Sequence, residues 1–241
     1  ELLTANLHVV ERGDTEVEVI DYYDDEGKTI VIPLDPQKTP SENAQAYFKR
    51  YTKAKHSLEI VRQQIEKTEQ EIDYFERLIQ QMESAAPKDV EEIREELIEE
   101  GYLKRTASRK KERKKVTTPA IEHYRSSTGI DFYVGKNNKQ NDYLTMKFAR
   151  RDDIWLHTKD IPGSHVVIRD DNPDEQTLIE AATVAAFYSK ARLSSSVPVD
   201  YTKVRHVKKP SGAKPGYVIY EHQSTLYVTP KEEMVRSLKV K

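Results

Sequence analysis

The sequence contains no cysteine, which excludes disulfide bonds, cysteine zinc ligands and a cysteine nucleophile. It has no apolar run that approaches the ~20 residues of a membrane-spanning helix. It also lacks His-x-x-x-His and Glu-x-x-His helix motifs, and residues 194–196 form a serine loop run instead of a nucleophile elbow. We therefore expect no catalytic residue, no bound metal, no cofactor and no membrane partner.

Charge is abundant, at 33% of the residues, and the formal net charge of -2 hides a strong separation of sign. Residues 88–100 contain seven acidic residues against Lys88 and Arg94, and residues 104–115 contain eight basic residues against Glu112 alone. Residues 201–217 contain five basic residues and no acidic one. Separate basic blocks on a near-neutral chain favour local binding to a polyanion.

The first part of the chain predicts an arm made of helix and β-hairpin. Residues 1–9 are typical of the end of a helix, and residues 17–20 and 29–32 alternate as hairpin strands around a turn at 24–27. Thr39, Pro40 and Glu42 then form a helix start with a capping box. An apolar seam at heptad spacing follows, which predicts one coiled-coil helix over residues 40–84. The seam consists of Ala44, Tyr47, Tyr51, Ala54, Leu58, Val61, Ile65, Thr68, Ile72, Phe75, Ile79 and Met82.

A seam of this length needs a partner helix of similar length. Within the chain the only candidate is a short return helix over residues 89–100, with Ile93 and Leu97 on its apolar side, which can cover only the near end. We expect either an antiparallel helix upstream of Glu1 or a second copy of this chain to cover the rest. The order of helix, hairpin and helix favours the upstream helix and makes residues 1–38 the tip of the arm.

The expected fold class is α+β, with a long coiled-coil helix, a small β-hairpin tip and a compact two-layer α+β domain. Residues 39–103 hold the long and return helices, and residues 104–118, which lack apolar periodicity, predict a flexible basic linker. The α+β domain occupies residues 119–241. We expect its strands near 132–134, 154–157, 165–168, 201–207, 217–221 and 225–228, and its helices over 142–149, from the Asn172 cap to about 191, and from Lys231.

Strand alternation predicts an open face on the sheet of this domain. It places apolar residues on one face and Trp155, His157, His165 and Arg169 on the other. If helices cover the apolar face, these rings can stack RNA bases and Arg169 can hold phosphates. The alternative is that Trp155 belongs to the core, as large aromatic residues usually do, and that both histidines are structural.

Two basic loops add candidate RNA contacts. Residues 135–141 hold Lys136, Asn137, Asn138 and Lys139 before a helix start, where backbone N–H groups favour an anion; an ordinary turn capped by Asn141 is the alternative. Residues 201–216 combine basic side chains with a Pro/Gly loop that suits phosphate contacts; a solvated, lysine-rich edge strand is the alternative. The candidates in this second loop are Lys203, Arg205, His206, Lys208, Lys209 and Lys214.

Several motifs give the chain a family resemblance. Residues 135–145 (GKNNKQNDYLT), 152–158 (DDIWLHT), 163–169 (GSHVVIR) and 201–216 resemble the C-terminal domain of the NFACT family, and LLTANL at 2–7 and TPSENAQ at 39–45 resemble its arm. The chain is thus similar to the C-terminal part of that family, the coiled-coil arm plus the NFACT-R domain. The family includes RqcH, NEMF and streptococcal fibronectin-binding proteins, and the chain looks most like a streptococcal member.

The resemblance implies a ribosome quality-control factor that binds obstructed large ribosomal subunits and supports tRNA-dependent C-terminal alanine tailing. It implies a cytoplasmic protein whose partners are large-subunit RNA and tRNA, with RNA binding in the C-terminal domain. It also brings an alternative, a fibronectin-binding adhesin that reaches the cell surface without a signal peptide; the two roles are compatible. An enzyme that acts on RNA through His157 and His165 is the third hypothesis.

Overall fold

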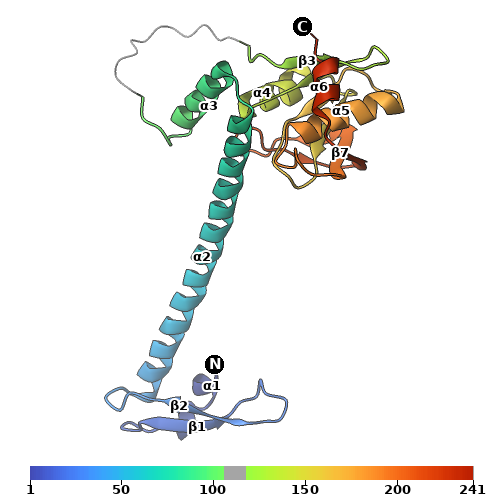
Figure 1. Cartoon of the computed structure of the whole chain (residues 1–241). Helices are drawn as coiled ribbons and strands as arrows, with labels where there is room; N and C mark the ends of the chain where they lie inside the picture. The colour runs from blue at the N-terminus through green and yellow to red at the C-terminus, as the bar shows by residue number, and fades with distance from the viewer. Residues whose placement is uncertain (106–117, 241) are drawn as a thin grey trace. The chain divides into compact units, whose positions relative to one another are not determined.

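The computed structural model of the chain describes residues 1–105 and 118–240. It divides into two compact units, residues 1–69 and 70–241, which are described separately. Helix α2 (Pro40–Glu83) crosses the boundary between them (Figure 1). This confirms the expected long helix and the α+β class. The predicted linker over 104–118 lies outside the described residues except at its ends.

The first unit is a small hairpin packed on the start of α2. It contains α1 (Leu2–Ala5), the 3₁₀ turn η1 (Leu7–Val9), β1 (Glu16–Ile20) and β2 (Thr29–Pro33), with Val19 opposite Ile30 in the antiparallel register. Leu3, Val10 and Leu34 form its buried core. The capping box forms as predicted, because the Thr39 backbone N–H donates to Glu42 at 2.8 Å and the Glu42 N–H donates to the Thr39 hydroxyl at 3.3 Å.

The second unit is built on a six-stranded sheet in which every neighbouring pair is antiparallel, in the order β10-β7-β5-β6-β4-β3. Its strands are β3 (Glu122–Arg125), β4 (Asp131–Val134), β5 (Ile154–Thr158), β6 (Val166–Ile168), β7 (Val197–Lys203) and β10 (Ser224–Val228). Strand β3 was not expected. Its four residues are polar or aromatic without an apolar alternation, so the sequence pattern gave no strand there.

Helices α5 (Glu175–Phe187) and α6 (Glu232–Leu238) cover one face of this sheet (Figure 1). Helix α5 presents fully buried alanines at 181, 182, 185 and 186, which allow its backbone to lie close to the strands. Asp174 caps this helix by accepting from the Thr177 N–H at 2.9 Å, two residues later than the predicted cap at Asn172. The main core of the unit lies between this helix layer and the sheet.

The opposite face of the sheet is also covered. Helix α4 (Asn138–Tyr143), the π-helix η2 (Leu144–Phe148), the 3₁₀ turn η3 (Val204–His206) and the short hairpin of β8 (Val207–Lys208) and β9 (Ile219–Tyr220) surround a second core. Trp155 is fully buried there with Leu144, Val167 and Val207. The expectation of an open Trp/His/Arg face is therefore wrong for Trp155, and its core alternative is correct.

Helix α3 (Pro87–Glu99) packs on the end of α2 through Ile93, Tyr74 and Leu78. We expected it to cover the near end of the heptad seam, and this is wrong. Tyr74 and Leu78 lie between seam positions, while the seam residues Ile79 and Met82 stay 64% and 46% exposed. None of the helices in the described part of the chain is long and apolar enough to cross a bilayer.

Candidate nucleic-acid interface

The loop over residues 135–141 is closed by its own side chains. Asn137, not Asn141, caps α4, and its side chain accepts from the Gln140 N–H at 2.8 Å. The Asn138 N–H donates to Gln81 of α2 at 3.2 Å. A Cβ on Gly135 would lie 2.4 Å from the Asn141 side-chain oxygen, so this close approach requires glycine. Two of the N–H groups expected to hold an anion, those of Asn138 and Gln140, therefore already have protein acceptors.

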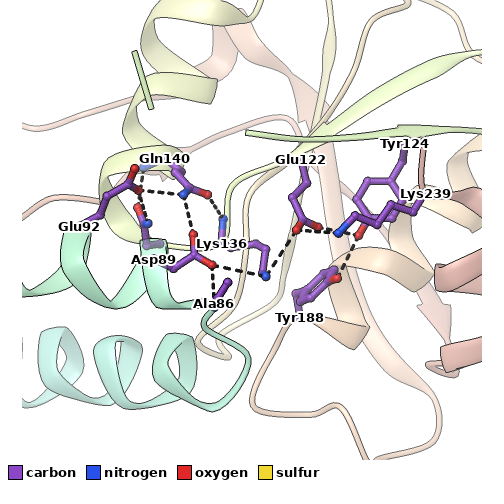
Figure 2. Close-up of polar contacts among 10 residues, drawn as sticks. Ala86, Asp89, Glu92, Glu122, Tyr124, Lys136, Gln140, Tyr188 and Lys239 are labelled. Carbon is purple, nitrogen blue, oxygen red and sulfur yellow. Dashed lines mark hydrogen bonds and ion pairs between the residues drawn. The ribbon is translucent and has the colours of Figure 1, made fainter. Parts of the chain in front are cut away.

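Lys136 lies in a half-buried ion-pair network. Its Nζ is 3.6 Å from Asp89 of α3 and 3.5 Å from Glu122 of β3, and its side chain is only 10% exposed (Figure 2). Lys239 contacts the same Glu122 oxygen at 2.9 Å. Burial raises the pKa of Glu122, but Lys239 and Lys136 outweigh it and lower that pKa overall. Lys136 thus joins α3 to the edge of the sheet.

The neighbouring loop residues also face α3. Asn137 donates to Glu92 at 2.7 Å, and Lys139 lies 2.7 Å from Glu99. Asn138, which is fully buried, donates to Glu96 at 2.9 Å. Burial raises the pKa of Glu96, although hydrogen bonds from Asn138 and Tyr74 oppose the shift. All four predicted contacts in this loop are therefore turned toward the protein.

The loop after β8 is likewise fixed by contacts with other parts of the protein. Lys214 donates to Glu100 at 2.6 Å, and its Nζ lies 5.3 and 4.9 Å from the ring centroids of Tyr74 and Tyr102. The Glu100 hydrogen bond raises the pKa of Lys214, although burial opposes the shift. Lys209 pairs with Asp142 of α4.

Gly216 lies in the same loop. It has a φ of 77°, and a Cβ there would lie 2.4 Å from the Asn138 side-chain oxygen. Its close approach is thus to Asn138 and not to a phosphate. Gly212, the other glycine of this loop, has nothing within 4 Å of a Cβ.

His157 and His165 lie beside Trp155 on the covered face. The His157 ring stacks on Trp155 at a centroid distance of 5.8 Å, and His165 meets it edge-on at 5.2 Å. His165 Nδ1 is 2.8 Å from the Thr145 hydroxyl. Burial lowers the pKa of His157 to about 4 and places the pKa of His165 well below its usual value, so both rings are neutral at pH 7. This arrangement is that of structural histidines, which was the alternative interpretation.

Arg169 is also engaged inside the protein. Its Nε lies 3.5 Å from the buried carboxylate of Asp153, and its guanidinium donates to the Phe148 carbonyl at 2.7 Å. The guanidinium carbon lies 4.7 Å from the Phe148 ring centroid, so the planar group also packs on that aromatic ring. Its side chain is 21% exposed, and its role here is to hold η2 on the sheet.

Of the remaining candidates, Arg205 and Lys208 lie on a solvent-facing surface, together with three basic residues that the sequence pattern had not indicated. The Arg205 N–H donates to the Arg151 carbonyl at 2.9 Å, and the Val204 N–H donates to the Asp153 carbonyl at 3.0 Å. These bonds bring residues 151 and 153 beside residues 204 and 205, and Phe148, Ala149, Val204 and Val207 pack in one hydrophobic cluster. We call the exposed cations gathered here the open basic surface: Lys147, Arg150, Arg151, Arg205 and Lys208.

The cations of the open basic surface form few ion pairs. Within the described residues, only its Arg205 has an ion pair, with Asp152 at 2.8 Å, and that pair is itself exposed. Lys203 and His206 are half-buried beside it. Burial, His222 and Arg205 lower the pKa of His206, and the two imidazole rings lie 4.7 Å apart. The run Lys147-x-x-Arg150-Arg151 was the available sequence signal for the missed residues.

The described residues contain no group of three or more His, Cys, Asp or Glu side chains that could hold a metal ion. The close contacts of the predicted site residues are thus ion pairs, hydrogen bonds and ring packing. The exposed cations of this site can bind an anion. The cations that already pair with carboxylates can bind one only weakly.

Comparison with known proteins places two family descriptions on the chain. The family "NFACT N-terminal and middle domains" matches residues 1–116, and "NFACT protein RNA binding domain" matches residues 121–222. A Bacillus subtilis protein named "Rqc2 homolog RqcH" is 60% identical over 239 residues, which are 99% of this chain and 42% of the relative. A Streptococcus suis protein of the same name is 44% identical over 242 residues, 100% of this chain and 43% of the relative.

The chain therefore spans less than half the length of these curated relatives. A solved structure also matches most of this chain. It is the C-terminal piece of the fibronectin/fibrinogen-binding protein of Streptococcus suis, with a TM-score of 0.78 and 43% identity over 84% of this chain and 81% of that one. Identity is higher to the Bacillus relative than to the streptococcal ones.

Proposed function

Since the chain belongs to the NFACT family, we propose that it acts as a non-catalytic RNA-binding module of a ribosome quality-control factor. The observation that carries this proposal is the open basic surface, where Lys147, Arg150, Arg151 and Lys208 face solvent without ion pairs among the described residues. Free cations of this kind bind phosphates by releasing condensed counterions. The family description of residues 121–222 as RNA-binding supports the same assignment.

We extend the proposal to the substrate that the family resemblance implies. We propose that the module binds RNA of obstructed large ribosomal subunits and their tRNA, and that it supports C-terminal alanine tailing by a longer protein. The contribution of the open basic surface is electrostatic anchoring, which carries little sequence specificity because it contacts phosphates and not base edges.

The non-catalytic part of the proposal rests on His157 and His165. Their neutral, hydrogen-bonded rings pack on Trp155 on the covered face of the sheet, and His165 is only 2% exposed. A nuclease or transferase activity of the chain that disappears in His157→Ala or His165→Ala would contradict this. We expect no such activity from the purified chain with rRNA or tRNA.

Co-sedimentation with large ribosomal subunits across a salt series tests the RNA-binding proposal. We expect the wild-type chain to pellet with subunits at low salt and Arg150→Glu/Arg151→Glu to stay in the supernatant. Lys159→Glu/Lys231→Glu is the matched control, because it changes the net charge equally at exposed lysines away from the open basic surface. Equal loss of binding in both variants, or in neither, would contradict the proposed site.

The similarity to the Streptococcus suis fibronectin/fibrinogen-binding protein favours a second candidate, a surface adhesin that binds fibronectin. Surface plasmon resonance on immobilised fibronectin tests it. Binding that persists at about 0.3 M salt and resists competition by heparin would support a specific adhesin, since exposed charge pairs are largely screened there. Binding that either treatment abolishes would identify non-specific attraction by the open basic surface.

A further inference from the structure

Five of the predicted RNA contacts, together with Gln140, share one partner. Three cations and three amides of the α+β domain all contact carboxylates of α3 or of Glu100, the residue that directly follows it. The contacts are Lys136 with Asp89, Asn137 with Glu92, Asn138 with Glu96, Lys139 with Glu99, Gln140 with Asp89 and Glu92, and Lys214 with Glu100. We call these six donor residues the covered donors.

The carboxylates form a row along one side of α3. Asp89, Glu92, Glu96 and Glu99 are spaced at intervals of three and four residues, so they repeat about every 5 Å along a single helix face. Ile93, at the edge of this face, packs on Tyr74 and Leu78 of α2. Helix α3 is thus held to α2 by apolar contacts and presents a polyanionic edge to the domain.

A carboxylate row and a phosphate backbone use the same donors. Lysine ammonium groups and side-chain amides donate equally well to carboxylate and phosphate oxygens. Lys139 and Lys214 keep side-chain exposures of 25% and 31%, so solvent ions reach this end of the row, while Lys136 at the other end is 10% exposed. An incoming polyanion can therefore begin to replace the carboxylates at the Lys139 end, where the Glu99 side chain is 53% exposed.

We propose that the covered donors are a second RNA-phosphate-binding surface, which the carboxylate row of α3 occupies in the free protein and from which RNA displaces it. This inference rests on the proposed RNA-binding function. It makes the acidic block at residues 88–100 an internal competitor of RNA. RNA first contacts the open basic surface. The covered donors bind RNA phosphates only after the RNA has displaced α3 from them.

The test compares binding of a fluorescent single-stranded polyuridine by the intact chain and by a variant with weakened α3 contacts. The variant Glu92→Gln/Glu99→Gln/Glu100→Gln keeps the hydrogen-bonding oxygens but removes three charges. Asp171→Asn/Glu175→Gln/Glu233→Gln is the control, because it removes three exposed carboxylates that have no side-chain partner in the described structure. We expect about tenfold tighter binding for the α3 variant and about twofold for the control.

The salt dependence gives a second readout. Two cations, Lys139 and Lys214, lose their carboxylate partners in the α3 variant, and their contact with a single strand steepens the slope of log K against log salt by about 1.4. We expect this steepening in the α3 variant and an unchanged slope in the control. Hydrogen exchange of the wild-type chain gives a third readout, in which RNA should reduce the protection of residues 87–99.

Equal affinity gains and equal slopes for the two variants, with α3 still protected when RNA is bound, would overturn this inference and leave the proposed function standing. If none of the three proteins binds polyuridine or large ribosomal subunits, the proposed function is wrong and the inference fails with it. The hydrogen-exchange readout does not depend on any variant, so a substitution that disturbs α3 cannot hide the outcome.

Discussion

Two groups of cations in the α+β domain differ in what faces them. Lys136, Lys139 and Lys214 lie against the carboxylates of α3 and Glu100, whereas Lys147, Arg150, Arg151 and Lys208 face solvent. Both groups come from short, lysine- or arginine-rich segments that sequence inspection treats alike. The difference shows that a basic segment is available to RNA only when the tertiary structure leaves it without an acidic partner.

The largest difference between the groups is expected in stability. Lys136→Ala leaves Asp89 without its ion pair and reduces the charge compensation of Glu122, so we expect a loss of about 3 kcal/mol in the free energy of unfolding. Arg151→Ala on the open basic surface should change it by about 0.5 kcal/mol or less. Urea denaturation of both variants measures the change in the free energy of unfolding. Equal losses in the two variants would contradict the distinction between the two groups of cations.

The buried histidine His157 is expected to make the stability of the chain depend on pH. The pKa of His157 is about 4 in the folded chain and about 6.5 when unfolded, so the ring is neutral in both states above pH 6.5. As the pH falls from about 6.5 to 4, the unfolded state binds a proton that the folded state rejects, and stability falls by about 2 kcal/mol.

His157→Gln tests this effect, because the variant should lose part of the pH dependence between 6.5 and 4. Denaturation midpoints measured at several pH values give the slopes to compare. His206→Gln is the control, since His206 lies beside the open basic surface and makes no buried contact with Trp155. Identical pH slopes in wild type and His157→Gln would show that the covered histidine does not behave as a buried neutral ring.

A smaller effect on stability is expected at two glycines of the loop after β8. Gly216 and Gly212 have nearly the same φ, 77° and 75°, but a Cβ would meet Asn138 at the first position and nothing within 4 Å at the second. Both alanine substitutions strain the backbone by about 1 kcal/mol. Gly216→Ala must also displace Asn138, so its melting temperature should fall about twice as far as that of Gly212→Ala. Equal decreases in melting temperature would mean that Asn138 can move away from position 216 without loss of stability.

The smallest effect concerns two neighbours in sequence. Lys208 is exposed without an ion pair in the described structure, and Lys209 pairs with Asp142. Lys208→Ala should weaken RNA binding about threefold and reduce the salt slope by about 0.7, whereas Lys209→Ala should change affinity by less than about twofold. Fluorescence anisotropy on the same RNA measures both, and the reverse order of effects would contradict the assignment.

Local signals in the sequence were sufficient for parts of the fold. The Thr39/Glu42 capping box and the heptad spacing place α2 to within a residue, because capping and periodicity depend on neighbours along the chain. Helix α4 starts at Asn138 and not near 142, because Asn137 provides the cap. The polar edge strand β3 carries no alternation and was missed for that reason.

The site depended on contacts that no local pattern encodes. Trp155 is buried because the hairpin of β8 and β9, some 50 to 65 residues later in the chain, folds over it. Lys136 is covered because α3, from a segment about 40 residues earlier, brings Asp89 to it. In contrast, the run from Lys147 to Arg151 was visible in the sequence. It was passed over because its availability depends on the neighbouring Arg205 segment, whose backbone N–H donates to the Arg151 carbonyl.

The proposed function depends most on the open basic surface, and one measurement tests directly whether this surface binds RNA. Binding of large-subunit rRNA by the wild-type chain and by Lys147→Ala/Arg150→Ala/Arg151→Ala should be measured across a salt series. Removal of three phosphate contacts predicts a slope of log K against log salt that is shallower by about 2. An unchanged slope, in a variant whose unfolding midpoint equals that of wild type, would contradict the claim that these cations hold the RNA.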